Sequence, residues 1–110
     1  MDKYQKVYGA LGLSRRAGKC LAGDFAVERA VKAGRAKLIV LDSSVSDATR
    51  KRYQALCSNK GIHCLEFPEM GRAIGKPDGK IAAVTDERFV QMICSAAAQL
   101  NKESFDQPNS

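Results

Sequence analysis

The alternation of helix-like and strand-like segments constrains the fold of this chain more than any other feature. The apolar residues Tyr4, Val7, Tyr8 and Leu11 recur at helical spacing and predict a helix that ends near residues 14–18. The ranges 36–41, 62–65 and 81–84 are short apolar runs bounded by turn residues, as is typical of buried strands. The full order, α-β-α-β-α-β-α-β-α, predicts a three-layer α/β/α sandwich around a four-stranded, mostly parallel (mixed) sheet.

Capping and turn residues predict where the remaining elements begin and end. Asp24 can cap a helix that stops at Gly34, and a short apolar piece at 19–22 precedes it as a strand. The other expected features are a helix capped by Ser46 or Asp47 and ended by 59–61, a short helix with Pro68 in its first turn, and a last helix capped by Thr85 or Asp86. Residues 1–100 are thus expected to form one domain, and 101–110 a frayed polar tail.

Length and hydropathy limit the environment in which such a domain works. The chain has 110 residues, which is enough for one core and too few for two stacked domains. No apolar run approaches the roughly 18 residues needed to cross a bilayer, and residues 1–6 do not lead into a secretory apolar segment. We therefore expect a soluble cytoplasmic protein with no membrane partner.

Catalytic, metal and cofactor motifs are weak throughout. The four cysteines are 37, 7 and 30 residues apart without a Cys-x-x-Cys pair, so we expect free thiols and no metal. The segment 12–20 resembles a phosphate-binding loop, but five residues separate its glycines and Cys20 replaces the magnesium-binding hydroxyl. His63 has no expected nucleophile or carboxylate partner. We expect no enzyme activity, no cofactor and no small-molecule substrate.

The distribution of charge indicates a polyanionic partner. Residues 1–76 hold 15 basic and 7 acidic residues, a balance of +8, whereas residues 77–110 hold 3 and 5, a balance of −2. Clustered positive charge attracts phosphate backbones, although it also serves plain solubility. Arg29 and Lys32 share one exposed face of the helix that begins at Asp24, so its free backbone amides and these cations can together bind phosphate.

Four motifs in order resemble one protein family. They are the segments 11–19 (LGLSRRAGK), 23–38, 70–75 (MGRAIG) and 83–86 (AVTD), and the resemblance extends from about Tyr4 to Ile93. Together they are similar to the bacterial YlxQ-type members of the L-seven-Ae and L-thirty-e superfamily of ribosomal proteins. The resemblance implies an α/β/α sandwich that binds structured RNA, typically a kink-turn, in which tandem sheared G·A pairs lie beside a sharp bend.

The same resemblance implies a set of RNA-contacting residues. Kink-turn binders carry Asn-Glu-x-x-Lys at the start of the second helix, where this chain has Phe25, Ala26 and Arg29. Phe25 and Ala26 lack the amide and carboxylate that read base edges, but Phe25 can stack on an unpaired base. The candidate RNA-binding residues are Arg15, Arg16, Lys19, Gly23, Asp24, Phe25, Ala26, Arg29, Lys32, Phe67, Met70 and Arg72.

The resulting functional expectation is a non-enzymatic RNA-binding protein, ribosome-associated or acting on structured, kink-turn-like RNA. The alternative is a protein-interaction module that keeps the fold and has lost specific RNA recognition. The two differ in whether the basic face is used.

Overall fold

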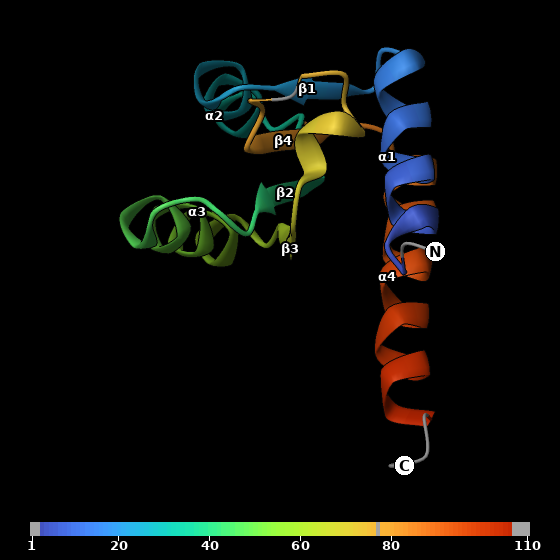
Figure 1. The fold of residues 1–110 in the computed structure, drawn as a ribbon. Coiled ribbons are helices and arrows are strands. Elements are labelled where there is room, and N and C mark those ends of the chain that lie inside the picture. The colour runs from blue at the N-terminus through green and yellow to red at the C-terminus, as the bar shows by residue number, and fades with distance from the viewer. Residues whose placement is uncertain (1–2, 77, 107–110) are drawn as a thin grey trace.

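A four-stranded sheet lies between two pairs of helices (Figure 1). The computed structural model describes residues 3–76 and 78–106. In chain order the elements are α1 (Gln5–Arg16), β1 (Cys20–Ala22), α2 (Asp24–Lys32), β2 (Leu38–Asp42), α3 (Asp47–Lys60), β3 (His63–Phe67), the 3₁₀ helix η1 (Met70–Arg72), β4 (Ile81–Val84) and α4 (Glu87–Asp106). The α/β/α fold class predicted from the sequence is confirmed.

The sheet is mixed, with the spatial order β1-β4-β2-β3. Strands β2 and β3 pair in parallel, whereas β4 runs antiparallel to both β1 and β2. The expectation of a mostly parallel sheet is therefore wrong for two of its three pairings. The reason lies in the connection from β3 to β4, whose helix η1 has only three residues. Such a short 3₁₀ helix cannot return the chain to the other end of the sheet, so β4 starts at the end where β2 and β3 finish.

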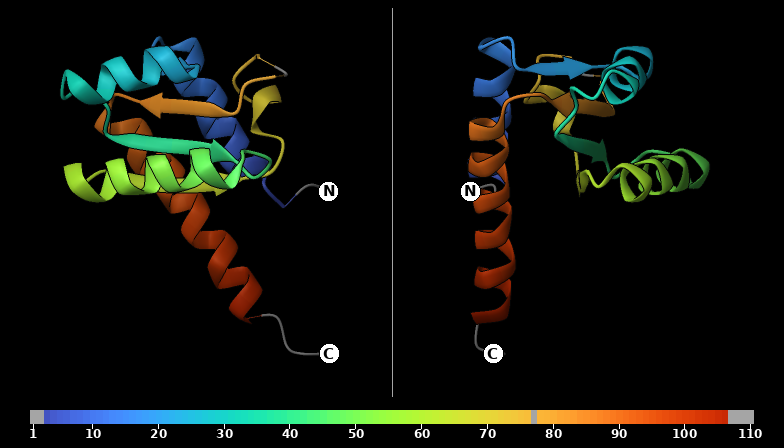
Figure 2. Two further views of the ribbon diagram at one scale, coloured as in Figure 1. Left: turned by 90° about the vertical axis from the view of Figure 1, so that its left-hand side faces the viewer. Right: turned by 180° about the vertical axis from the view of Figure 1, so that it is seen from behind.

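Alternating side chains of the strands form two separate cores. In β2, Leu38 and Val40 pack with α1 and α4, whereas Ile39 and Leu41 pack with α2 and α3. All five residues of β2 are buried, as expected of a strand covered on both faces. Figure 2 shows the helix pairs on opposite faces, and α4 continues well past the sheet.

Two predicted helix starts are confirmed, and two are not: Pro68 precedes η1 and its N-cap Glu69 instead of lying in the first turn of a helix, and Asp24 does not cap α2. The Ser46 hydroxyl accepts a hydrogen bond from the Thr49 N–H at 3.1 Å, and the Asp86 carboxylate accepts one from the Arg88 N–H at 2.9 Å. Asp24, by contrast, is the first residue of α2, and the N-cap is Gly23 with φ 104°. The Asp24 side chain instead bonds to Arg52 and Tyr53 of α3, so it does not cap α2.

The last helix is longer than the sequence pattern indicated. We expected it to end at Leu100, but α4 continues to Asp106. The polarity of residues 101–106 does not prevent a helix, because they contain neither glycine nor proline, and Lys and Glu favour helix. The expected tail at 107–110 lies outside the described residues. Over the described ranges, no helix is long and apolar enough to cross a membrane.

Candidate nucleic-acid interface

Helix α2 begins where β1, the start of β4 and the loop before β4 meet. The Gly23 N–H donates a hydrogen bond to the Ile81 carbonyl at 2.9 Å, which joins this corner to the sheet. A cleft of about 430 Å³ lies here, and Gly23, Asp24, Lys76 and Lys80 are among the residues that line it. A Cβ at Gly23 would lie 4.0 Å from the Lys76 Nζ. The start of α2 therefore lies near the Lys76 ammonium, in a cleft that is lined by two lysines and by the carboxylates Asp24 and Asp78.

Arg52 of α3 pairs with both carboxylates of α2. Its guanidinium lies 2.8 Å from Asp24 Oδ2 and forms a second ion pair with Glu28, and the Tyr53 hydroxyl also donates to Asp24. The hydrogen bond from Tyr53, together with the smaller effect of Arg52, holds the pKa of Asp24 below its usual value. The negative charges of α2 are thus neutralised on the side of α3.

A neighbouring side of α2 carries an exposed aromatic ring. The Phe25 side chain is 75% exposed, and the Arg29 guanidinium carbon lies 5.6 Å from the centre of its ring. Phe25, Ala26 and Arg29 line a hollow of about 270 Å³ together with Leu21, Ala30, Ala33 and Arg35. The three positions that replace Asn, Glu and Lys of the kink-turn signature therefore share one surface feature.

The basic residues at the end of α1 form a second group. Arg15 donates a hydrogen bond to the Cys20 carbonyl at 3.0 Å, and Arg16 and Lys19 are exposed. They lie at the start of β1, whereas α2 begins after its end, so the three residues of β1 separate the groups by roughly 10 Å. The structure places these cations beside the α2 group along one edge of the sheet, not in contact with it.

The structure corrects the expectation of RNA contact for two of the three candidates Phe67, Met70 and Arg72, which lie at the end of β3 and in η1. Phe67 and Met70 are 6% and 0% exposed, because they pack into the core beneath α1. The Phe67 ring lies 6.1 Å from that of Tyr4. Their apolar side chains therefore stabilise the fold and are not available to touch a base or sugar. Arg72 alone of these three is exposed.

A buried carboxylate holds this loop in place. Asp42, at the end of β2, accepts hydrogen bonds from the N–H groups of Ser44 and Met70, each at 2.9 Å. Burial by itself would raise the pKa of Asp42, but these donors and the nearby Lys80 outweigh it and lower the pKa. Asp42 thus connects β2 to η1, which leads to Lys76 of the cleft.

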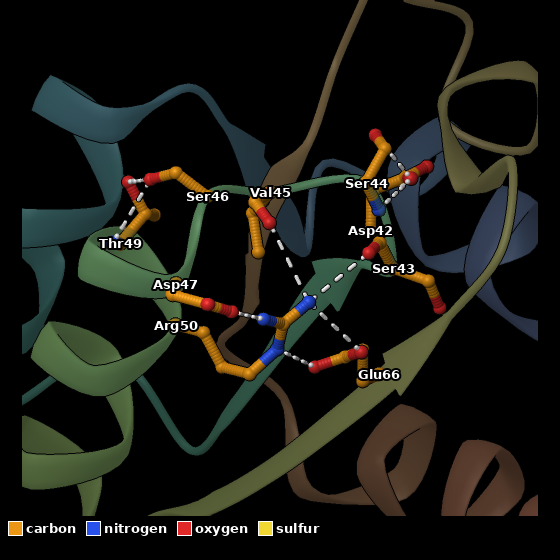
Figure 3. A network of polar contacts seen from close by, with 9 residues as sticks. All are labelled: Asp42, Ser43, Ser44, Val45, Ser46, Asp47, Thr49, Arg50 and Glu66. Atoms are coloured by element: carbon orange, nitrogen blue, oxygen red, sulfur yellow. Dashed lines mark hydrogen bonds and ion pairs between the residues drawn. The ribbon is translucent and has the colours of Figure 1, made fainter.

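Arg50 organises the neighbouring connection between β2 and α3 (Figure 3). Its guanidinium lies 2.7 Å from Asp47 and 2.8 Å from Glu66 of β3, and it donates to the Ser43 carbonyl at 3.0 Å. Both carboxylates raise the pKa of Arg50. Arg50 therefore stabilises the fold, and it neutralises the charge of Glu66 in β3.

Sequence reasoning missed four cations that the fold brings to this region. Lys76 and Lys80 line the cleft, Arg35 lines the hollow, and Arg52 pairs with Asp24 and Glu28. The segment 75–80 (GKPDGK), with two lysines around a turn signal, could have indicated the first pair. Arg35 and Arg52 give no local signal, because their roles depend on contacts with distant elements.

Reactive and metal-binding groups are sparse in the described part of the chain. No cluster of three or more His, Cys, Asp or Glu side chains there could hold a metal ion. The four cysteines are free, and burial raises the pKa of the Cys57 thiol to about 12. What the fold presents instead is a binding surface of cations, backbone amides and one exposed ring.

The class of protein to which this α/β/α sandwich belongs follows from comparison with known families. The chain belongs to the ribosomal protein L7Ae/L30e/S12e/Gadd45 family, whose model matches residues 5–94. The RNA-binding protein YlxQ of Bacillus subtilis is 32% identical over 88 residues, which cover 77% of this chain and 88% of that protein. The protein of the same name from Enterococcus faecium is 28% identical over 90 residues, covering 79% and 86%.

Solved structures support the same assignment of fold. A Bacillus halodurans protein of unknown function has a TM-score of 0.74 at 31% identity, covering 87% of this chain and 97% of that one. The Giardia lamblia 15.5kD RNA binding protein has a TM-score of 0.72 at 13% identity, covering 93% and 90%. The second likeness concerns the fold alone.

Proposed function

We propose that this chain is a non-enzymatic RNA-binding protein that acts in the cytoplasm on structured RNA, ribosomal RNA included. The observation that carries the proposal is the surface around the start of α2. It presents Arg29, Lys76 and Lys80, and Arg52 neutralises Asp24 and Glu28, the two carboxylates of α2, which leaves Asp78 as the further carboxylate that lines the cleft. The names of the YlxQ relatives support the same class of ligand.

Recognition of a kink-turn requires a different chemistry here from that of the family signature. Phe25 and Ala26 supply no hydrogen bond to base edges, so discrimination must come from phosphate placement and stacking. We infer that this protein reads the shape of a bent RNA more than the identity of its G·A pairs.

The RNA affinity is expected to fall steeply with salt. Each phosphate that a lysine or arginine neutralises releases condensed counterions, so the logarithm of the binding constant falls linearly with the logarithm of salt. Filter binding of a folded RNA hairpin between low and moderate salt measures the slope. An affinity that stays flat would contradict the proposal.

That flat outcome would favour a second candidate function, a protein-interaction module. The observation behind it is a groove of about 450 Å³ between α1 and α4, where Leu13 and Met92 are each 44% exposed. Apolar surface of this kind fits a protein partner better than an RNA.

Arg52→Gln is expected to weaken RNA binding several-fold with little loss of stability. The variant releases the charges of Asp24 and Glu28 beside the start of α2, where they repel phosphate. The Arg52 side chain is 41% exposed, so its ion pairs contribute less than about 1 kcal/mol to the free energy of unfolding. Anisotropy titrations and urea unfolding measure the two effects.

The matched control adds Asp24→Asn and Glu28→Gln to Arg52→Gln. This triple variant removes the unpaired charges and should recover the RNA affinity. If Arg52→Gln binds RNA as well as the parent does, the carboxylates of α2 do not face the RNA.

A further inference from the structure

We propose that the hollow beside Phe25 is a seat for one unpaired nucleobase of the bound RNA. This inference rests on the proposed function and adds to it a stacking site at the positions where the family signature has its polar residues. The occupant is a base that stacks on the Phe25 ring while its flanking phosphates lie against arginines.

The first support is the exposure and surroundings of the ring. Phe25 is 75% exposed, the largest fraction among the exposed large hydrophobic residues of the described chain. Leu21 and Ala30 are also among the lining residues, so the hollow has an apolar component. The Arg29 guanidinium lies over one face of this ring, 5.6 Å from its centre, and the rest of the exposed ring leaves a π surface open to a planar ligand.

The second support is the charge around the hollow. Arg29 and Arg35 line it, and no carboxylate is among its lining residues in the described structure. Asp24 and Glu28, the acidic residues of α2, are paired with Arg52 of α3. The charged side chains that line the hollow are therefore all positive, and they attract the phosphates on both sides of an RNA nucleotide.

The third support is size. The hollow is about 270 Å³, just below the roughly 300–1,000 Å³ found for sites of drug-sized ligands. It suits a single planar ring system and is too small for a folded peptide element. Every base has a π face, so this seat selects unpaired nucleotides without selecting their sequence.

The test compares two RNA hairpins of equal length and phosphate number. One carries a bulge of adenosines, and the other carries abasic residues at the same bulge. Fluorescence anisotropy should show that the parent protein binds the adenosine bulge about 5- to 150-fold more tightly, as expected for stacking of one base. Phe25→Ala should abolish this ratio while keeping the affinity for the abasic hairpin, because it removes no charge.

Three further variants identify the source of the effect. Phe25→Tyr keeps a stacking ring and should keep the ratio, and Leu13→Ala, which truncates another exposed apolar side chain on α1, should leave it unchanged. Arg35→Gln should weaken both hairpins by a similar factor. Circular dichroism verifies the fold of each variant.

The possible results separate the inference from the proposed function. A parent protein that binds both hairpins equally, or a Phe25→Ala variant that keeps the ratio, overturns the base seat and leaves RNA binding intact. A parent that binds neither hairpin overturns both proposals.

Discussion

Arg29→Glu is expected to weaken the binding of every structured RNA by about 10- to 150-fold. Hydrogen bonds to charged groups contribute roughly 1.5–3 kcal/mol, and the substitution replaces one such donor with a charge that repels phosphate. Arg29 lies on the exposed side of α2 against the Phe25 ring, and no ion pair engages it within the described structure. Its charge is therefore available to a ligand. Anisotropy titrations at constant salt measure the effect.

Arg88→Glu is the matched control for the same change in net charge. Arg88 is 89% exposed near the start of α4, on the face of the sheet opposite α2. This control should lose little affinity, and Arg29→Lys should lie between the parent and Arg29→Glu because it keeps the charge but not the planar fork. Equal losses in Arg29→Glu and Arg88→Glu would show that net charge alone drives binding and that α2 is not the interface.

Asp42→Ala is expected to lower the free energy of unfolding by about 1–3 kcal/mol at neutral pH. The reason is that the buried N–H of Met70 loses its acceptor, and an unsatisfied buried donor costs about that amount. Asp47→Ala, which removes an exposed carboxylate from the neighbouring Arg50 network, should cost less than about 1 kcal/mol. Urea unfolding followed by circular dichroism compares the two.

The pH dependence of Asp42 has a definite sign. Its pKa is lower in the folded chain than the usual value near about 3.9, so the unfolded state binds the proton more tightly. The stabilisation is full above that value and is lost as the pH falls below it. The difference between the parent and Asp42→Ala should therefore shrink in acid. A difference that is constant from neutral pH to well below about 4 would mean that the Asp42 charge contributes nothing.

The Asp42→Ala variant also tests how the fold positions the cleft. Asp42 holds η1 through the Met70 N–H. The Lys76 N–H in turn donates a hydrogen bond to the Gly71 carbonyl of η1 at 2.9 Å. Loss of this anchor should reduce RNA affinity without removing any cation. Unchanged affinity would show that Lys76 is placed by the turn itself.

Local patterns predicted much of the fold and part of the site. Strand β4 matches the expected range Ile81–Val84, and Ser46 and Asp86 cap their helices as predicted. These features depend on backbone conformation and on side chains within a few positions, which a sequence displays directly. The same periodicity predicted that Arg29 is exposed on α2, whereas its place beside Phe25 was not predicted.

The burial of Phe67 and Met70 could not be read from their neighbourhood. An apolar residue in a turn region faces either a ligand or the core, and its type is the same in both cases. The packing of α1 over the end of β3 decides between them. The length of α4 shows a second limit of local patterns. Polar residues also form a helix where the backbone permits it, so polarity alone does not mark the end of a helix.

By itself, the sequence determined the order of helices and strands, the caps at Ser46 and Asp86, the excess of basic residues and the membership of a family. The tertiary structure alone decided the antiparallel position of β4 between β1 and β2, and the pairing of Arg52 with carboxylates 28 and 24 residues away. The physical reason is the distance along the chain over which each interaction acts. Periodicity and capping act within a few residues, whereas strand order and ion pairing depend on which distant surfaces become buried together.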